Sequence, residues 1–373
     1  MTSKGCNHPL AVSTWGEEER DAILKVLDSG NFTMGKKVKE FEEFYADWVG
    51  SKYAVMVNSG SSANLLMVAA YTLRNFPDGW YKENDDDPSV PVVIVPAVSW
   101  STSYSPFQQY GWKLKFVDID KDTLNYNIDE LTKAFTGNEL ILSVNILGNP
   151  NDYRWFPSHN ILEDNCESMG ATYAGLRTGN FGLMSSHSTF FSHHMQTMEG
   201  GVVTTDNENY YQMLLCLRSH GWTRHLPENN VFKVKPSAYD FIFPGYNVRP
   251  IEMMAAVGIE QLKKLDGFIK GRRENAERWK EVCERRNWWM QKETESAKSS
   301  WFAFAIVDDQ IDEIKKELEA GGIEYRPLIA GNFTRSQSIK YYNAEFGDLP
   351  NADRAHDKGI YIGNFHNRID FNL

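Results

Sequence analysis

Two adjacent histidines, His193 and His194, stand near the centre of the stretch SSHSTFFSHHMQTMEGGVVTT at residues 185–205. A run rich in serine and threonine precedes them, and a glycine pair followed by a valine-rich run comes after them. Because imidazole titrates near neutral pH, a histidine on such a loop can accept and return a proton. Thr189 lies five residues before His194, so the same strand and loop supply a hydroxyl group and a base. Taken alone, His194 is equally compatible with an ordinary surface histidine, and we assign His193 no role.

A second candidate is the stretch NSGSSAN at residues 58–64, which follows a predicted strand and opens a predicted helix. The backbone N–H groups of a first helical turn, here at Gly60 and Ser61, favour an anion such as phosphate. An ordinary serine N-cap would produce the same local pattern.

Two further stretches follow predicted strands. In LEDNCES at residues 162–168, a carboxylate at the strand end could pair with a protonated ring nitrogen of a cofactor, whereas a solvated turn is the alternative. In PAVSWST at residues 96–102, Trp100 could stack on a planar cofactor. Since the chain holds 11 tryptophans, a core tryptophan is the alternative there.

The stretch GYNVRP at residues 245–250 precedes a long predicted helix. It offers the Asn247 amide and the Arg249 guanidinium, both suited to phosphate. The same residues fit a plain helix start with Pro250 at the first position, and both interpretations can hold together.

The elements that position these residues alternate between short apolar runs and longer helical patterns, which predicts an α/β fold with a mainly parallel, seven-stranded sheet. A long amphipathic helix over residues 251–286 connects it to a smaller α+β part. We therefore predict a large domain at 1–250 and a connecting helix with a small C-terminal domain at 251–373. The predicted strands of the large sheet are 52–57, 92–96, 114–117, 140–147, 161–163, 188–191 and 202–204, with helices at 61–74 and 128–135. The C-terminal part is predicted to hold strands at 301–307 and 323–326 around a helix at 311–320.

The composition narrows the class of protein. A net charge of −11 over 373 residues lacks the basic footprint of a nucleic-acid-binding protein. No apolar run predicts a signal peptide or a membrane span, so we expect no membrane partner. The cysteines are scattered, which predicts reduced thiols in a cytoplasmic protein and neither a zinc nor an iron–sulfur site. They are Cys6, Cys166, Cys216 and Cys283.

Five motifs occur in one order: NSGSSANL, PAVSW, EDNCES, STFFSHH with EGG, and PGYNVR. This ordered set resembles the DegT-type sugar aminotransferases, fold type I enzymes that use pyridoxal 5'-phosphate (PLP) on nucleotide-linked keto sugars. The likeness runs from about Leu10 to Phe365. It implies a homodimer with shared active sites.

In that family a lysine holds the cofactor, and the resemblance places His194 at its position. Histidine forms no Schiff base, so the likeness is to the family's sugar 3-dehydratases, which carry a histidine there. It implies removal of the C3 hydroxyl group from GDP-4-keto-6-deoxy-D-mannose, with His194 moving the proton. L-Glutamate would convert PLP to pyridoxamine 5'-phosphate (PMP), and ammonia would be released. A nucleotide-sugar aminotransferase and a non-catalytic PLP-binding relative are the alternatives.

The resemblance also implies roles for other residues. Asp164 would bind the pyridine nitrogen, Trp100 would stack on the ring, and Glu167 would lie near the ring oxygen. Gly60, Ser61 and Thr189 would hold the phosphate group, and Asn247 would reach the phosphate in the partner subunit. The candidates for the nucleotide-sugar pocket are His220, Arg224, Arg326 and Asn332.

Overall fold

The computed structural model describes residues 7–76, 90–157, 159–237, 239–371 and 373. Within it Cys166, Cys216 and Cys283 are free thiols. Cys6 lies outside the described residues. No helix in these ranges is long and apolar enough to cross a membrane.

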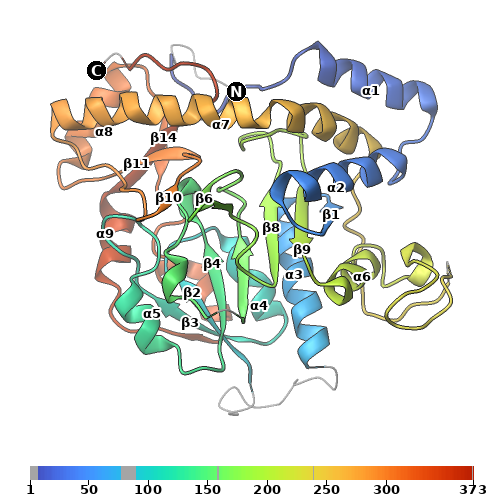
Figure 1. Cartoon of the computed structure of the whole chain (residues 1–373). Helices are drawn as coiled ribbons and strands as arrows, with labels where there is room; N and C mark the ends of the chain where they lie inside the picture. The colour runs from blue at the N-terminus through green and yellow to red at the C-terminus, as the bar shows by residue number, and fades with distance from the viewer. Residues whose placement is uncertain (1–6, 77–89, 158, 238, 372) are drawn as a thin grey trace.

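An eight-stranded sheet forms the centre of the molecule (Figure 1). All neighbouring strands run parallel except β9, which is antiparallel to both β1 and β8. The seven predicted strands are present, and the two-residue β13 adds an eighth at one edge. In sheet order the strands are β1 (Tyr53–Val57), β9 (Gly201–Thr205), β8 (Met184–Ser188), β5 (Ile161–Asp164), β4 (Leu140–Val144), β2 (Val92–Pro96), β3 (Lys113–Val117) and β13 (Ala344–Glu345).

Strand β8 differs from its prediction: it spans Met184–Ser188, whereas residues 188–191 were expected. The prediction followed the β-forming residues Thr189, Phe190 and Phe191. In the structure every residue of β8 is buried, while Phe190 and Phe191 are exposed. Pairing with β5 and β9 therefore decides the strand's position, because both neighbours bond to the small polar residues.

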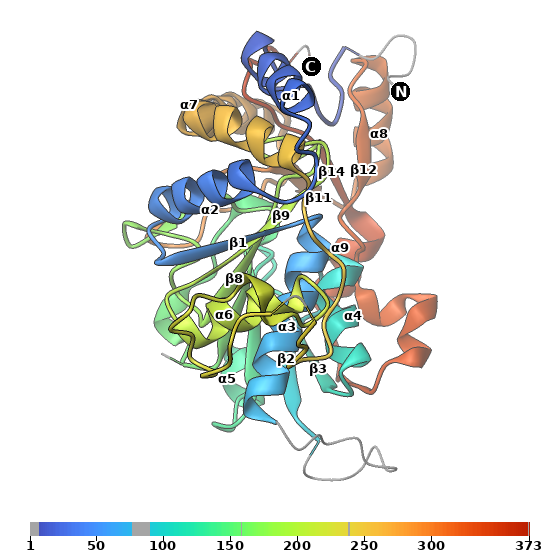
Figure 2. The same ribbon diagram turned by 90° about the vertical axis from the view of Figure 1, so that its right-hand side faces the viewer.

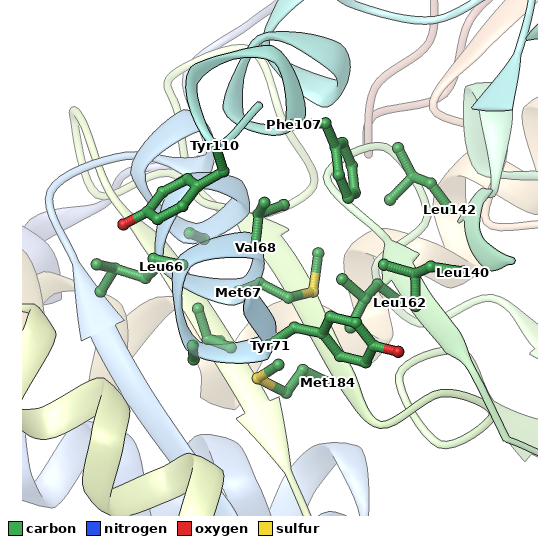
Figure 3. Close-up of a cluster of buried hydrophobic side chains, with 14 of the residues drawn as sticks. Leu66, Met67, Val68, Tyr71, Phe107, Tyr110, Leu140, Leu142, Leu162 and Met184 are labelled. Atoms are coloured by element: carbon green, nitrogen blue, oxygen red, sulfur yellow. The ribbon is translucent and has the colours of Figure 1, made fainter. Parts of the chain in front are cut away.

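Helices cover both faces of the sheet. On one face α3 (Gly60–Asn75), α4 (Ser101–Gln109) and α6 (Glu208–Leu217) enclose a large apolar cluster, part of which Figure 3 shows around Met67 and Phe107. On the other face lie α2 (Lys36–Val49), α5 (Ile128–Ala134) and α7 (Glu252–Arg286). Since the strands carry apolar side chains toward both faces, the sheet is a buried central layer.

The 35-residue helix α7 runs the length of the molecule and carries a smaller antiparallel sheet near its C-terminal end (Figures 1 and 2). That sheet has the order β11 (Ala303–Val307), β14 (Gly359–Gly363) and β12 (Tyr325–Pro327). Helix α8 (Ile311–Ala320) matches its predicted bounds, and α9 (Pro350–Lys358) precedes β14. Helix α1 (Glu17–Ser29) packs on α7.

The division at residue 250 stays a prediction, because chain segments cross it. His8 forms a bridge with Ile323, and β13 from the C-terminal part joins the large sheet. The remaining short elements are β6 (Thr172–Tyr173), β7 (Leu176–Arg177), β10 (Ala297–Lys298) and the 3₁₀ turns Ile146–Gly148, Tyr153–Trp155, Thr223–His225, Phe333–Arg335 and Gln337–Tyr341.

Candidate active site

A cavity of about 640 Å³ opens where the parallel strands of the large sheet end, beside the small sheet. This is the edge at which open α/β sheets bind their ligands. Six residues selected from the sequence line it, namely Gly60, Ser61, Trp100, Asp164, Glu167 and Arg326. Residues that the sequence analysis left without a role also line it, among them Asn64, Ser103, Cys166, Ser188, His193, Glu199, Phe302 and Tyr361.

Asp164 is the last residue of β5 and is buried. Its Oδ2 accepts hydrogen bonds from Asn64 Nδ2 (2.8 Å) and Ser103 Oγ (2.7 Å). Its Oδ1 accepts one from the Cys166 backbone N–H (3.1 Å). Hydrogen-bond donors on both oxygens stabilise the ionised carboxylate and fix its direction. The arrangement suits a protonated ring nitrogen in the cavity.

The N-terminus of α3 meets the end of β8 at Gly60. A Cβ atom at this position would lie 2.6 Å from Ser188 Cβ and 2.9 Å from Cys166 Sγ, so only glycine fits. Ser59 caps the helix by accepting from the Ser62 N–H (3.1 Å). The side chain of Ser61 meets Thr102, with 2.8 Å between the two hydroxyl oxygens. The close backbone approach and the unpaired first-turn amides make this corner an anion site.

Trp100 and Glu167 border the same cavity. Trp100 is 58% exposed and directly precedes α4, which excludes the core alternative. Glu167 Oε2 accepts from the Leu147 N–H (2.9 Å). Burial raises the pKa of Glu167 to about 7, and the nearby Asp164 charge acts in the same direction. Glu167 is therefore poised between its protonated and ionised forms near neutral pH.

Of the two adjacent histidines, His193 lines the cavity. Its ring lies 5.0 Å from the Phe302 ring and 5.9 Å from the Phe190 ring, centroid to centroid. Its Nδ1 is buried and has no hydrogen-bond partner. Burial, helped by the charge of Arg272, lowers the pKa of His193 to about 3. A neutral imidazole at this place can accept a proton.

The structure corrects the placement of His194, which is fully buried behind the cavity. Its Nε2 lies 3.2 Å from the Ser300 carbonyl oxygen. Thr189 is also turned away, with its Oγ1 2.5 Å from Thr197 Oγ1. Ser188, one residue earlier, takes the place expected for Thr189.

The physical reason is the alternation of side chains along β8. Ser186 bonds to Asn64 of α3 and Ser188 contacts Gly60, whereas His187 packs against Tyr45 of α2. The predicted strand begins four residues after the observed start of β8, so it did not show which of these side chains face α3 and which face α2. The sequence analysis chose Thr189 and His194, whereas the cavity is lined by Ser188 and His193. Both choices are therefore one residue too late, and the spacing of five residues between the hydroxyl group and the histidine is the same in both pairs.

Asn332 also lies outside the cavity lining. It is buried, its Oδ1 accepts from the Thr334 N–H (3.0 Å), and its Nδ2 donates to Asp353 (2.9 Å). It thus caps a 3₁₀ turn, which corrects its assignment to the nucleotide-sugar pocket.

The remaining predicted residues lie on another surface. Arg224 and Asn247 line a depression of about 320 Å³, which we call the Asn247 surface. His220 lies beside it, with its ring 4.6 Å from the Trp222 ring. The structure therefore does not bring His220, Arg224 or Asn247 to the cavity of their own chain. The Asn247 surface is lined by Thr33, Met34, Trp222, Arg224, His225, Asn247, Arg249, Pro250 and Ile251.

These observations fit PLP or PMP, the group that the resemblance implies. The corner at the N-terminus of α3 suits a phosphate group, because Gly60 and Ser61 of its first turn line the cavity there. Asp164 offers a carboxylate fixed by three donors, and Trp100 offers an exposed aromatic face. Among the described residues no lysine lines the cavity, whereas His193 does.

Known proteins resemble this chain over nearly its whole length. The GDP-4-keto-6-deoxy-D-mannose 3-dehydratases of Yersinia pseudotuberculosis and Escherichia coli O55:H7 are each 47% identical, over 96% of this chain and 94% and 95% of theirs. A solved GDP-4-keto-6-deoxymannose-3-dehydratase with a trapped PLP-glutamate geminal diamine matches with a TM-score of 0.89 and 44% identity, covering 98% of this chain and 97% of that one.

A double variant of the same dehydratase, with a histidine and the serine immediately before it replaced, gives a TM-score of 0.88 and 44% identity, with 97% of each chain covered. The model of the DegT/DnrJ/EryC1/StrS aminotransferase family matches residues 13–368. With that match and relatives at 47% identity, the chain belongs to the DegT/DnrJ/EryC1/StrS aminotransferase family.

Proposed function

We propose that this chain is a PLP/PMP-dependent 3-dehydratase that removes the C3 hydroxyl group of GDP-4-keto-6-deoxy-D-mannose. L-Glutamate supplies the amine, and ammonia is released. The observation that carries the proposal is a cofactor-type cavity lined by His193 and, among the described residues, by no lysine. The 47% identity to two such dehydratases supports the same substrate. We also propose a cytoplasmic location, which fits the free cysteines.

We assign the proton-moving role to His193. In the solved double variant a histidine was replaced together with the serine immediately before it. In this chain Ser192 precedes His193, whereas another histidine precedes His194. The serine before it and its place in the cavity lining thus both favour His193.

The other residues bind and orient the cofactor. Asp164 would hold the ring nitrogen, Trp100 would stack on the ring, and Glu167 would lie near the ring oxygen. The phosphate group is held by the first-turn amides of α3 together with Ser188. When bound, the cofactor supplies an electron sink and carries the amine.

His193 moves the proton. Its neutral imidazole would take a proton from the cofactor carbon that bears the amine and would give it to the C3 hydroxyl group. The electrons left by that proton would then allow the C3–O bond to break, and water would leave. Arg326 of β12 lines the open side of the cavity and offers a guanidinium to the diphosphate of the nucleotide sugar.

We further propose a homodimer in which the Asn247 surface completes the partner's active site. Asn247 is exposed and lies on a surface distinct from its own chain's cavity. Ile251, at the same depression, and the nearby Phe241, which bridges to Trp222, are exposed apolar residues suited to an interface.

Mixing two strongly impaired variants tests this arrangement. A dimer of one His193→Asn chain and one Asn247→Asp chain, whose carboxylate would repel the phosphate group, contains one site with both native residues and one with neither. We expect mixed, re-equilibrated samples to regain about a quarter of the parent activity, because about half the dimers are mixed and each holds one intact site. Activity that stays at the level of the separate variants contradicts a shared site.

The mass of the sugar product tests the reaction. The protein is incubated with PLP, L-glutamate and GDP-4-keto-6-deoxy-D-mannose. A product lacking one oxygen, with ammonia and 2-oxoglutarate, establishes the dehydratase. An amino sugar indicates an aminotransferase instead, and an unchanged sugar with no 2-oxoglutarate indicates a non-catalytic relative. An unchanged sugar with 2-oxoglutarate formed retains the cofactor chemistry and rejects the substrate.

A further inference from the structure

Arg272 is a buried arginine in the middle of α7, directly behind the histidine loop. Its Nη2 donates to the His193 carbonyl oxygen (3.3 Å). Its Nη1 donates to the carbonyl oxygens of Phe302 (2.9 Å) and Asn364. These acceptors are neutral, and in the described part of the chain no carboxylate lies within ion-pair distance of it.

A buried guanidinium without an acid partner is costly and therefore calls for an explanation. Burial lowers the pKa of Arg272 to about 9, which still leaves it charged at neutral pH. Three carbonyl dipoles point at this charge, and they come from the histidine loop, from the segment before β11 and from the segment after β14. Arg272 thus joins α7, the small sheet and the active-site loop at one point.

We propose that Arg272 is a positioning residue for His193: it fixes the histidine loop through the His193 carbonyl group and keeps the imidazole uncharged. A positive charge without a local anion disfavours a second positive charge nearby. Phe302, whose backbone carbonyl Arg272 binds, places its ring against the His193 ring. The same side chain therefore fixes the place of the base and adds to the burial that keeps it uncharged. The proposal rests on the assignment of His193 under the proposed function.

Other charged groups surround His193, and their contributions differ in sign. Arg326 of β12, like Arg272, disfavours the imidazolium, whereas Asp164, Glu167 and Glu199 favour it. His194 adjoins it on the loop, Tyr361 of β14 lines the cavity, and Arg273 and His366 adjoin Arg272. Because the acids face the cavity and Arg272 lies behind the loop, removing the arginine leaves an excess of negative charge around the imidazole.

The test compares Arg272→Gln, which removes the charge but keeps a donor, with Arg272→Lys, which keeps a charge at the acidic end of the titration but loses the planar fork. The readout is the protonation of His193 in the full-length chain, measured by ¹⁵N NMR of histidine-labelled protein between pH 5 and 8, with and without PLP. The signal is assigned by its loss in His193→Asn. Since Glu167 also titrates near pH 7, a rate profile alone would mix the two groups.

We expect His193 to stay neutral down to pH 5 in the parent and in Arg272→Lys. In Arg272→Gln the midpoint should rise by about two pH units or more, to the acidic end of the measured range. Equal midpoints in the two variants overturn the proposal and leave Arg272 a structural residue. If Arg272→Gln does not fold, the parent decides, because a parent midpoint near 6.5 also overturns it.

Product formation separates this proposal from the proposed function. At pH 5, where about half of its His193 would be protonated, we expect Arg272→Gln to form product about twofold more slowly than Arg272→Lys. If no chain, including the parent, forms a 3-deoxy product, the proposed reaction fails, while the NMR titration still decides the role of Arg272.

Discussion

The two sides of β8 and the loop after it carry the same residue types and do different work. On the cavity side are Ser186, Ser188 and His193, which contact α3 or line the cavity. The core side holds His187, Thr189 and His194, which are buried against neighbouring elements. Whether one of these residues can meet a ligand is therefore decided by the side of β8 that it faces and not by its residue type.

Strand β5 shows the same contrast with two carboxylates. Glu163 points into the fold, where its oxygens accept from the backbone N–H groups of Gly179, Phe181 and Gly182. Asp164, the next residue, lines the cavity. Glu163 thus holds a loop together, while Asp164 faces the ligand.

The largest effect is expected from replacing the two histidines one at a time. His193→Asn should lower the rate of 3-deoxy product formation by about 10³-fold, because it removes the base. His194→Asn should lower it by less than about tenfold and act mainly on stability. Single-turnover product formation and urea unfolding measure the two quantities. The reverse order of effects would return the catalytic role to His194.

The carboxylates of β5 should give the next largest difference. Asp164→Asn is expected to lower the reaction rate by about 10²-fold, because the ring nitrogen loses its anionic partner. Its urea unfolding curve should stay cooperative. Glu163→Gln should instead lower the midpoint of unfolding, since buried donors lose their acceptor. If Glu163→Gln lowers the reaction rate and leaves the unfolding midpoint unchanged, the assignment of Glu163 to stability and Asp164 to the reaction is incorrect.

The hydroxyl groups of β8 should give a smaller difference. Ser188→Ala removes one phosphate-binding group worth about 1 kcal/mol, which corresponds to roughly a fivefold weaker affinity for PMP. Thr189→Ala should leave that affinity unchanged, because its hydroxyl group bonds to Thr197. Fluorescence titration with PMP measures both. Equal weakening in the two variants would contradict the assigned orientations.

The core-side histidines should make stability fall with falling pH. Burial lowers the pKa of His187 to about 3 and holds that of His194 well below its ordinary value, so below pH 6.5 the unfolded chain binds more protons than the folded one. His193 acts in the same direction. Glu167 acts in the opposite direction between pH 7 and 4.5, because its pKa is raised to about 7.

His8, His225 and His366 also have lowered pKa values and act in the same direction as these three. The histidines together outweigh Glu167, so the free energy of unfolding should drop by at least about 2 kcal/mol between pH 6.5 and 5.5. Urea unfolding at the two pH values measures this drop. His187→Asn should flatten the dependence, and a stability that rises over this interval would refute the prediction.

Much of the fold was predictable, because it follows from apolar periodicity. Helix α8 has its predicted bounds, and α7 starts one residue late. Residues placed directly after strand ends, such as Trp100 and Asp164, reached the cavity because parallel strands end at one edge.

The predictions that differ from the structure concern which side of a strand a residue faces, or which contacts its side chain makes within the fold. Strand β8 is polar on both sides, so its sequence carries no apolar pattern to fix which serine faces α3. Ser186 and Ser188 lie on one side of the strand and His187 on the other. A strand prediction that included all three residues would have placed Ser188 on the cavity side, and the residue five positions later is His193. Asn332 is a different case, because its Oδ1 caps the turn at Thr334 and its Nδ2 donates to Asp353, 21 residues away, so both ends of its amide are engaged within the fold.

The hydrogen bonds on Asp164 have a cost for the fold. Asn64 and Ser103 surround a buried carboxylate with neutral donors, and in the described residues no cation lies within ion-pair distance of it. Such an anion is tolerated and not favoured by the protein alone, since donors compensate its lost hydration only in part. Part of the folding free energy is thus held back and is recovered when a positively charged ring nitrogen arrives. A bound cofactor would therefore stabilise the fold as well as take part in the reaction.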